Sequence, residues 1–444
     1  MATFDPWVAA QAYIATMSPA AQAKAVAYTH TQHWMLLWGF LAEVAVALII
    51  LWSGLLRRTR DGLEKNRPRP YLVSLVVVVI ASVMSAVLSL PWDIYRDWYV
   101  EKSFAMTSQP LGGWMREHLM NAVLGVVGAA IFFPLFYFLL RRARNTWPIW
   151  CGALVAVLAG LFLIVAPLFI EPLFNTYTPA PASPMRDAIV TLAKQTGTPS
   201  DKIYVYNGSK QSNRYTANVS GVGGSARVAI SDVTWKKATV SEMRGVVGHE
   251  MGHYVRGHSY FLMAAFGVLA AIVFFLVKLL FPLVSRLARA RGVKDIADPA
   301  GLPVLNITLS LVMLLATPAM STITRVAEAD ADRFSLEHAH DPDGLSAALV
   351  KTADYRAPNP TRLEEIVFYD HPSVFHRVYD AMVWKAKHMD LVEQTKVYDD
   401  QLQAAEDAWR SGKRAPALAL AGPPAPNAVT DDAPKVSLPS GSKK

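Results

Sequence analysis

The chain has 444 residues, of which 52% are hydrophobic and only 18% are charged, whereas soluble globular proteins carry about 25% charged residues. This composition argues against a fully soluble protein and indicates a lipid bilayer as partner. The formal charge of +8 favours basic cytoplasmic loops over nucleic-acid binding, for which no basic, aromatic-rich motif is visible. The single cysteine, Cys151, excludes intramolecular disulfides and cysteine-based metal sites.

The first 33 residues contain one lysine and no long apolar core, which argues against a cleaved signal peptide. Six apolar runs are long enough to cross a bilayer as helices, which takes about 20 residues. These runs are Trp34–Leu56, Tyr71–Trp92, Leu119–Leu140, Pro148–Ile170, Tyr260–Pro282 and Leu302–Ile323. Most lack the polar face of a soluble helix and are predicted to span the membrane. The sixth carries Asn306, Thr308 and Pro318, and we expect it to be broken or to line a cavity.

Positive charge gathers in three of the loops between these runs. Loop 57–70 holds six basic residues, the loop after Leu140 holds three and the loop after Pro282 holds four. Loop 93–119, in contrast, has three basic residues against four acidic ones. The positive-inside rule places the three basic loops in the cytoplasm and the polar region that follows the fourth run on the opposite side.

That polar region, from Glu171 to His258, is predicted to be a small soluble subdomain. Its predicted elements are a helix over Met185–Gly197, strands over Ile203–Tyr206 and Arg227–Ser231, a turn over Gly221–Gly224 and a helix over Thr239–His258. Ser241 is the candidate N-cap of the last helix. A second polar region, from Glu328 to about Trp409, is predicted to be mostly helical.

The sequence Val246-Val-Gly-His249-Glu250-Met-Gly-His253 lies in the last helix of the first polar region. Positions i and i+4 project from one face of a helix, so both imidazoles can bind one ion. Zinc prefers neutral nitrogen ligands, and a catalytic zinc site leaves a position open for water. Glu250 lies beside the first ligand, where a carboxylate can accept a proton from water that attacks a peptide carbonyl. The pattern favours a zinc-dependent hydrolase over an exposed helix with a charged face.

A tetrahedral site needs a third protein ligand, and acidic residues follow the sixth apolar run. Glu328 and Asp332 are one helical turn apart and share a face. Glu328 is the candidate third ligand, and Asp332 is the candidate acceptor for the free N–H of a ligand histidine. The alternative is a solvated acidic patch at a helix start. Asp330 is expected to point elsewhere, into solvent.

A third cluster lies in Tyr369-Asp-His371-Pro-Ser-Val-Phe-His-Arg377. His371 or Arg377 can stabilise the oxyanion that forms when water attacks the carbonyl. The alternative is an ordinary His-Pro turn before a helix. His258 lies on a different helical face from His253, and we interpret it as a polar residue near the bilayer surface.

Together these motifs resemble the type 1 CAAX prenyl endopeptidases, integral membrane zinc proteases of the gluzincin kind. The resemblance extends from about Tyr71 to Met382. The sequences that carry it are LPWDIYRDWYVEKSF, APLFIEPLFNTYTP, DKIYVYNGSKQS, RVAISDVT, VVGHEMGHYVRGH, RVAEADADRFSLEHA and DHPSVFHRV.

The resemblance implies a complete site with one zinc ion per chain. It implies His249, His253 and Glu328 as ligands, Glu250 as the catalytic base, Asp332 behind a ligand, His371 and Arg377 near the substrate carbonyl, and Thr216, Ala217 and Asn218 along an extended substrate. It also implies a water-filled chamber walled by membrane helices, which suits substrates with a lipid at one end. The chain departs from the family in having six predicted spans instead of seven, and Thr216-Ala217-Asn218 in place of Asn-Ala-Tyr. The family's zinc domain faces the cytosol, opposite to what the loop charges predict here.

We therefore expect a mainly α protein, a polytopic membrane helical bundle of six or seven spans with a small α+β gluzincin-like zinc protease domain. The expected parts are 1–170 with four spans, 171–259 with the zinc helix, 260–327 with two spans, 328–410 as the helical remainder of the protease domain and 411–444 as a disordered tail rich in Pro, Ala and Ser. The oligomeric state is not predicted.

The expected function is cleavage of lipidated or membrane-associated peptides, with or without a prenyl group, in a bacterial inner membrane. The alternatives are a stress-type quality-control protease of the membrane, and an inactive scaffold or transporter. An intramembrane site-2 type protease is disfavoured because Glu242 and Arg244 precede the zinc-binding pattern, which such enzymes place inside an apolar span.

Overall fold

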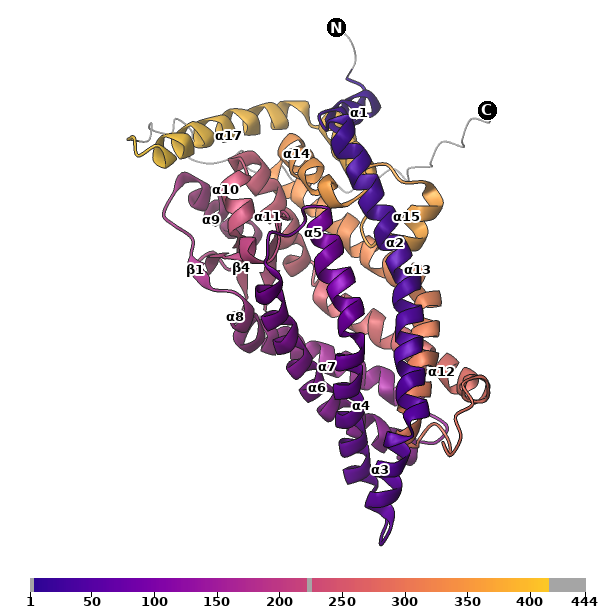
Figure 1. Ribbon diagram of the computed structural model, residues 1–444. Helices are drawn as coiled ribbons and strands as arrows, with labels where there is room; N and C mark the ends of the chain where they lie inside the picture. The colour runs from indigo at the N-terminus through magenta and orange to yellow at the C-terminus, as the bar shows by residue number, and fades with distance from the viewer. Residues whose placement is uncertain (1–3, 222–225, 415–444) are drawn as a thin grey trace, which may run out of the picture.

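A computed structural model describes residues 4–221 and 226–414. Most of the predicted turn at Gly221–Gly224 and of the predicted disordered tail lies outside these residues. The described chain is mainly helical with one four-stranded sheet, as predicted (Figure 1). The long helices form a bundle, and the sheet and the shorter helices lie at one end of it.

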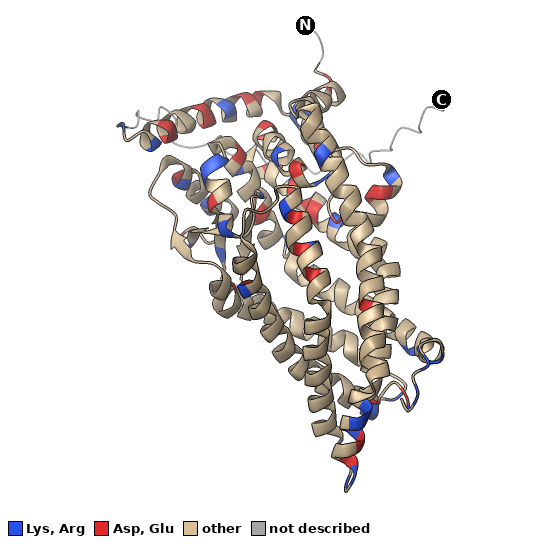
Figure 2. Ribbon diagram, viewed as in Figure 1, with Lys and Arg blue, Asp and Glu red and all other residues tan. Residues whose placement is uncertain are grey.

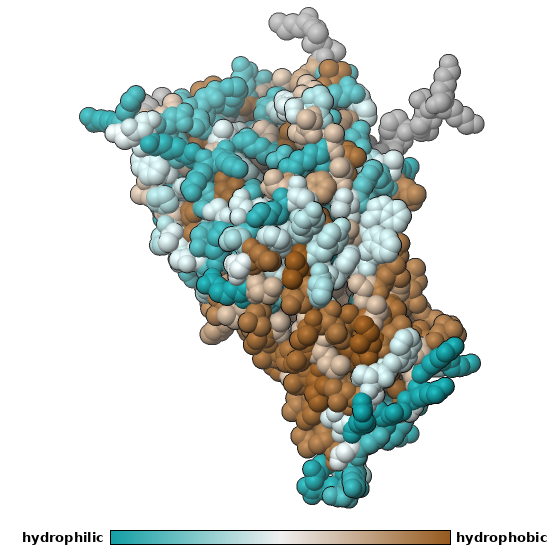
Figure 3. All heavy atoms as spheres, viewed as in Figure 1, coloured by the Kyte–Doolittle hydropathy of each residue, from teal (hydrophilic) through white to brown (hydrophobic). Residues whose placement is uncertain are grey.

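Six helices of the described chain are long and apolar enough to cross a membrane, which confirms the predicted spans. They are α2 (Pro19–Ser53), α4 (Pro70–Asp93), α6 (Leu111–Arg142), α7 (Trp147–Val165), α12 (His258–Leu287) and α13 (Leu302–Ala339). Short π-helical segments, η1 (Ile94–Val100) and η2 (Ala166–Ile170), carry α4 into α5 (Glu101–Ser103) and α7 into α8 (Glu171–Phe174). Figure 3 shows the apolar belt that these helices present, a surface suited to lipid tails.

Two local predictions about these helices need correction. The segment 57–70 is not simply a loop, because its first half forms helix α3 (Leu55–Glu64), which buries Leu56 and Arg60 and exposes Arg57 and Arg58. The sixth span is not broken, since α13 runs through Pro318 without interruption. The helix instead lines a cavity, which is the other alternative expected. Asn306 of α13 faces this cavity of about 290 Å³ between α2, α4 and α13.

The sheet consists of β1 (Tyr177–Pro179), β2 (Ile203–Tyr206), β3 (Ala217–Ser220) and β4 (Arg227–Ser231) in the order β1-β2-β4-β3. β2 and β4 are parallel, and the two outer strands pair antiparallel to them. β3 therefore has one edge without a strand partner in the described chain. The helices of this half are α9 (Pro184–Thr196), α10 (Asp232–Lys237) and α11 (Val240–Val255). Their apolar faces share one buried core with the sheet, which includes Ile189, Val228 and Met243.

The remaining helices complete the soluble end of the molecule. They are α1 (Pro6–Ala15), α14 (Pro342–Thr352), α15 (Arg362–Phe368), α16 (Val374–Lys387) and α17 (Met389–Arg410), with short 3₁₀ turns at η3 (Gly208–Lys210), η5 (Pro299–Gly301) and η6 (Ala353–Tyr355). Trp7 of α1 packs edge-on against Phe375 of α16, with 4.7 Å between the ring centroids. The first helix thereby joins the core beneath α14 and α16.

Candidate metal centre

Helix α11 carries the HExxH pattern, and its ends are set by local sequence. Thr239 is the N-cap, because its hydroxyl accepts a hydrogen bond from the Glu242 N–H while the Glu242 carboxylate accepts one from the Thr239 N–H. The predicted N-cap, Ser241, instead donates to Asp341 on the neighbouring loop. The helix ends at Val255 and not at His258, because Gly257 adopts a left-handed conformation with φ of 67°.

Three glycines of α11, Gly245, Gly248 and Gly252, bring it close to two other helices, and a Cβ atom on Gly248 would lie 2.8 Å from the Ser335 hydroxyl oxygen in α13. A Cβ atom on Gly245 would lie 2.8 Å from the backbone of Leu345 in α14. A Cβ on Gly252 would lie 3.0–3.2 Å from Phe334 and Ala331 in α13, which is closer than real side chains approach without a shift. The absence of side chains at these positions lets α13 approach the histidine-bearing helix.

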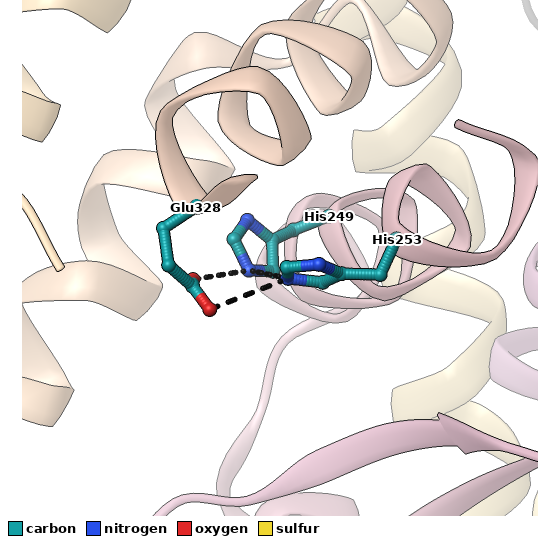
Figure 4. A group of neighbouring side chains, drawn as sticks. All are labelled: His249, His253 and Glu328. Carbon is teal, nitrogen blue, oxygen red and sulfur yellow. Dashed lines mark hydrogen bonds and ion pairs between the residues drawn. The ribbon is translucent and has the colours of Figure 1, made fainter. Parts of the chain in front are cut away.

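The approach of α13 sets Glu328 opposite the two histidines (Figure 4). The Nε2 atom of His249 lies 3.2 Å from Glu328 Oε2, and the Nε2 atom of His253 lies 3.5 Å from Glu328 Oε1. The two Nε2 atoms are 3.2 Å apart. Zinc bonds of about 2.0–2.2 Å place two ligands of a tetrahedron about 3.3–3.6 Å apart, so these three groups fit a tetrahedral zinc ion.

The hydrogen bonds behind the histidines support the same fit. The Nδ1 atom of His249 lies 2.8 Å from Asp332 Oδ1, and a carboxylate can only accept, so His249 donates through Nδ1 and keeps a lone pair on Nε2. His258 Nε2 lies 3.0 Å from Asp330 Oδ2 and donates to it. His258 Nδ1 then accepts from His253 Nδ1, 3.0 Å away, which leaves a lone pair on His253 Nε2. Two lone pairs that face each other repel unless a cation lies between them.

These contacts correct the interpretation of two residues. His258 is buried and lies behind His253, so it is more than a polar residue near the bilayer surface. Asp330 is not simply solvated, because it pairs with His258. The prediction from spacing was wrong because it assumed that His253 and His258 lie on one helix. His258 belongs to a new helix that begins after the turn at Gly257. The sequence VVGHEMGHYVRGH, one of those that carry the resemblance, ends at His258 and is the signal that could have pointed to it.

Asp332, Arg377 and His371 lie around the same three groups. Arg377 is buried and forms two hydrogen bonds of 2.6 Å with the Asp332 carboxylate, through Nε and Nη2. His371 Nε2 lies 3.0 Å from Glu328 Oε2, and its Nδ1 lies 2.7 Å from Asp370 Oδ1. Arg377 thus braces Asp332, while His371 stands at the edge of the candidate metal site.

A cavity of about 150 Å³ opens beside the histidines. Thr216, Ala217, Glu250, His371 and Arg377 are among the residues that line it. Asn218 follows on β3, but it is exposed and does not line the cavity. Burial raises the pKa of Glu250, and a higher pKa makes this carboxylate a stronger proton acceptor. The structure thus brings together every predicted site residue except Asn218.

Comparison with known families agrees with this geometry. The model of peptidase family M48 matches residues 179–385, and the model described as CAAX prenyl protease N-terminal, five membrane helices, matches residues 9–176. The chain is a member of peptidase family M48. This M48 chain is therefore a membrane metalloendopeptidase. Its residues 9–176 contain four candidate spans, namely α2, α4, α6 and α7, where the family description names five.

Relatives of this M48 peptidase occur in bacteria and eukaryotes. "Uncharacterized metalloprotease YhfN" of Bacillus subtilis is 25% identical over 372 residues, which cover 82% of this chain and 86% of that protein. "CAAX prenyl protease 1" of Saccharomyces cerevisiae is 24% identical and covers 69% of this chain and 71% of its own length. The crystal structure of S. mikatae Ste24p matches with a TM-score of 0.68 at 20% identity, over 83% of this chain and 89% of that one. The fold is therefore that of Ste24p.

Proposed function

We propose that the chain is a zinc-dependent endopeptidase in which His249, His253 and Glu328 bind one zinc ion. The observation that supports this most directly is the set of ligand separations of 3.2, 3.2 and 3.5 Å among the two Nε2 atoms and the Glu328 carboxylate. Asp332 and the pair of His258 and Asp330 hold the two imidazoles in the tautomers that a metal needs.

A zinc ion held by His249, His253 and Glu328 would supply a Lewis acid for the peptide carbonyl. Glu250 accepts a proton from the attacking water and returns it to the leaving amine. His371 in its protonated form, with Nδ1 donating to Asp370, is near enough to the site to donate from Nε2 to the oxyanion, and Arg377 keeps Asp332 in place behind His249. The free edge of β3, which begins at Ala217, can pair with an extended substrate.

We further propose that the substrate carries a lipid. A cavity of about 550 Å³ lies between α2, α12, α13 and α15, and its walls are mainly apolar. Its lining includes Phe40, Met313, Phe368 and Asp370, and Asp370 accepts a hydrogen bond from His371. An apolar cavity that reaches a neighbour of the metal site suits a lipid chain attached near the cleaved bond. We also propose that the enzyme lies in a bacterial inner membrane, because one of its relatives is a protein of Bacillus subtilis.

The zinc mechanism is tested with purified protein, by metal analysis and by cleavage of a peptide. We expect one zinc ion per chain in the wild type. Glu250→Gln should keep the metal and lose cleavage by about 10²–10⁴-fold, the usual contribution of a general base. Cleavage that survives this substitution would refute the mechanism.

The lipid is tested separately, with farnesylated and unmodified forms of one peptide. Ser310→Phe should fill part of the apolar cavity and slow cleavage of the farnesylated form about tenfold, with little effect on the unmodified form. The control, Val268→Phe, changes a residue of α12 that faces outward and is 64% exposed. Equal slowing of both peptides would remove the lipid proposal and leave the protease intact.

A further inference from the structure

The end of the bundle opposite the metal site concentrates positive charge (Figure 2). Segments 55–70, 141–147 and 286–299 together hold thirteen Lys and Arg residues and four Asp and Glu residues. Contacts join the segments into one surface. Arg60 pairs with Asp298 and Arg57 donates to the carbonyl of Arg291, which joins segment 55–70 to segment 286–299. Lys278 of α12, the helix that leads into segment 286–299, donates to the carbonyl of Asn145 in segment 141–147.

A cavity of about 310 Å³ lies within this surface. Three of its lining residues are arginines, Arg57, Arg289 and Arg291, and they come from α3 and from the segment after α12. The Arg57 side chain lies against Gly292, where a Cβ atom would be 2.6 Å from Arg57 Cδ. A larger residue at 292 would displace Arg57, so the glycine keeps the arginines of the two segments together.

The acidic residues of this end do not neutralise the three arginines. Asp61 and Asp298 pair with Arg60, and Glu64 lies 3.8 Å from Lys294. Asp295 accepts a backbone hydrogen bond from Ala297. In the described chain, Arg57, Arg289 and Arg291 have no ion pair. Three guanidinium groups around one cavity favour an anion with several oxygen acceptors.

The position of the cavity identifies the kind of anion. Trp52, which also lines it, is 62% exposed and donates from Nε1 to the carbonyl of Ala288. Leu287, just before that segment, is 74% exposed. The apolar belt adjoins a hydrophilic surface at this end of the molecule (Figure 3), and an exposed tryptophan at such a boundary is typical of the membrane interface. A ligand here can place a phosphate on the arginines and acyl chains against the belt.

We propose that Arg57, Arg289 and Arg291 form a binding site for the phosphate of an anionic phospholipid. The lipid would link α3 to the segment after α12 and so tie the first hairpin of membrane helices to the last. Each basic residue near a membrane surface contributes about 1 kcal/mol, so removing three should weaken binding roughly a hundredfold.

The test measures binding of short-chain phosphatidylglycerol to the full-length protein in neutral detergent, with short-chain phosphatidylcholine and inorganic phosphate as comparison ligands. The variant is Arg57→Gln/Arg289→Gln/Arg291→Gln. The matched control, Arg67→Gln/Arg142→Gln/Arg144→Gln, removes the same charge from exposed positions of the same end that do not line the cavity. We expect the cavity variant to lose phosphatidylglycerol binding and the control to stay within about threefold of wild type.

Three results would overturn the proposal. Equal loss in both variants would mean that the attraction is diffuse charge without a site. Equal binding of phosphatidylcholine would show that the site does not select an anionic lipid. Equal binding of inorganic phosphate would show that the site binds phosphate without a lipid. If the triple variant fails to fold, Arg289→Gln alone serves, because this exposed side chain has no hydrogen bond or ion pair to the described residues. It should then weaken phosphatidylglycerol binding several-fold.

Discussion

The Nδ1 atom of His258 lies 3.0 Å from the Nδ1 atom of His253, although the two residues belong to different helices separated by a left-handed glycine. Asp330 completes the chain of hydrogen bonds from α13. The helix that carries Glu328, the proposed carboxylate ligand, therefore also orients His253, a proposed histidine ligand. We therefore expect metal binding to depend on α13 in two ways: through Glu328, and through Asp330, which orients His253 by way of His258.

His258→Ala should weaken zinc binding 10–100-fold, the usual cost of losing a group that orients a metal ligand. The reason is that His253 loses the acceptor that holds its Nδ1 proton and is freer to rotate. The measurement is competition for zinc with a chelator, together with cleavage rate at saturating zinc. His338→Ala is the control, because His338, on α13, is outside the candidate metal site and forms a side-chain hydrogen bond only with the carbonyl of Phe334 among the described residues. Equal zinc affinities in the two variants would argue against the orienting role.

Gly252→Ala should lower both stability and cleavage. Its methyl group would meet Phe334 and Ala331 at 3.0–3.2 Å and push α13 away from the histidines. Overpacking of this kind costs about 1–3 kcal/mol. Gly62→Ala is the comparison, since a Cβ there meets nothing within 4 Å and alanine favours a helix by up to about 1 kcal/mol. Thermal unfolding and peptide cleavage are the measurements, and wild-type values for Gly252→Ala would contradict the close packing.

The pH dependence of stability should reflect a buried carboxyl group on α17 that is not part of the candidate metal site. Burial, together with the nearby Asp341 carboxylate, raises the pKa of Asp399 to about 7, even though Asp399 pairs with Arg244. A raised carboxyl pKa stabilises the folded state fully below the ordinary value of about 4, and this contribution is lost as the pH rises through 7.

Asp399→Asn should therefore show a smaller loss of thermal stability between pH 5 and pH 8 than the wild type does. The asparagine side chain keeps an oxygen that can accept a hydrogen bond from Arg244 but does not titrate. The control is Asp400→Asn, which removes the same charge from an exposed residue paired with Lys396. The idea fails if Asp399→Asn and Asp400→Asn have the same pH profile.

The orientation of the enzyme should follow its loop charges, with the basic end in the cytoplasm and the metal site on the other side. The single native cysteine, Cys151, is buried and can be replaced. In that background, Lys396→Cys should react with an impermeant maleimide in intact spheroplasts, whereas Arg144→Cys should react only after lysis. Both positions are exposed; Lys396 lies on α17, at the end of the bundle with the sheet (Figure 1), and Arg144 lies in the basic loop between α6 and α7. The reverse labelling would place the metal site in the cytoplasm.

The apolar runs and the HExxH spacing carried most of what could be predicted about this protein. A span reveals itself because about 20 consecutive residues must be apolar, and the i, i+4 pair reveals itself because both residues belong to one helix. The strands at Ile203–Tyr206 and Arg227–Ser231 were predicted with the bounds that the structure has. These signals are local, so each can be read from a short stretch of chain.

The tertiary structure alone decided which distant residues meet. Glu328 is 75 residues from His253 in the sequence, and only the packing of α13 on the glycines of α11 sets its carboxylate at 3.5 Å. The role of His258 depended on a turn that ended one helix and began another, and the basic cavity depended on contacts between α3 and the segment after α12. Such contacts leave no periodic trace, because they depend on how whole helices pack and not on the spacing within any one of them.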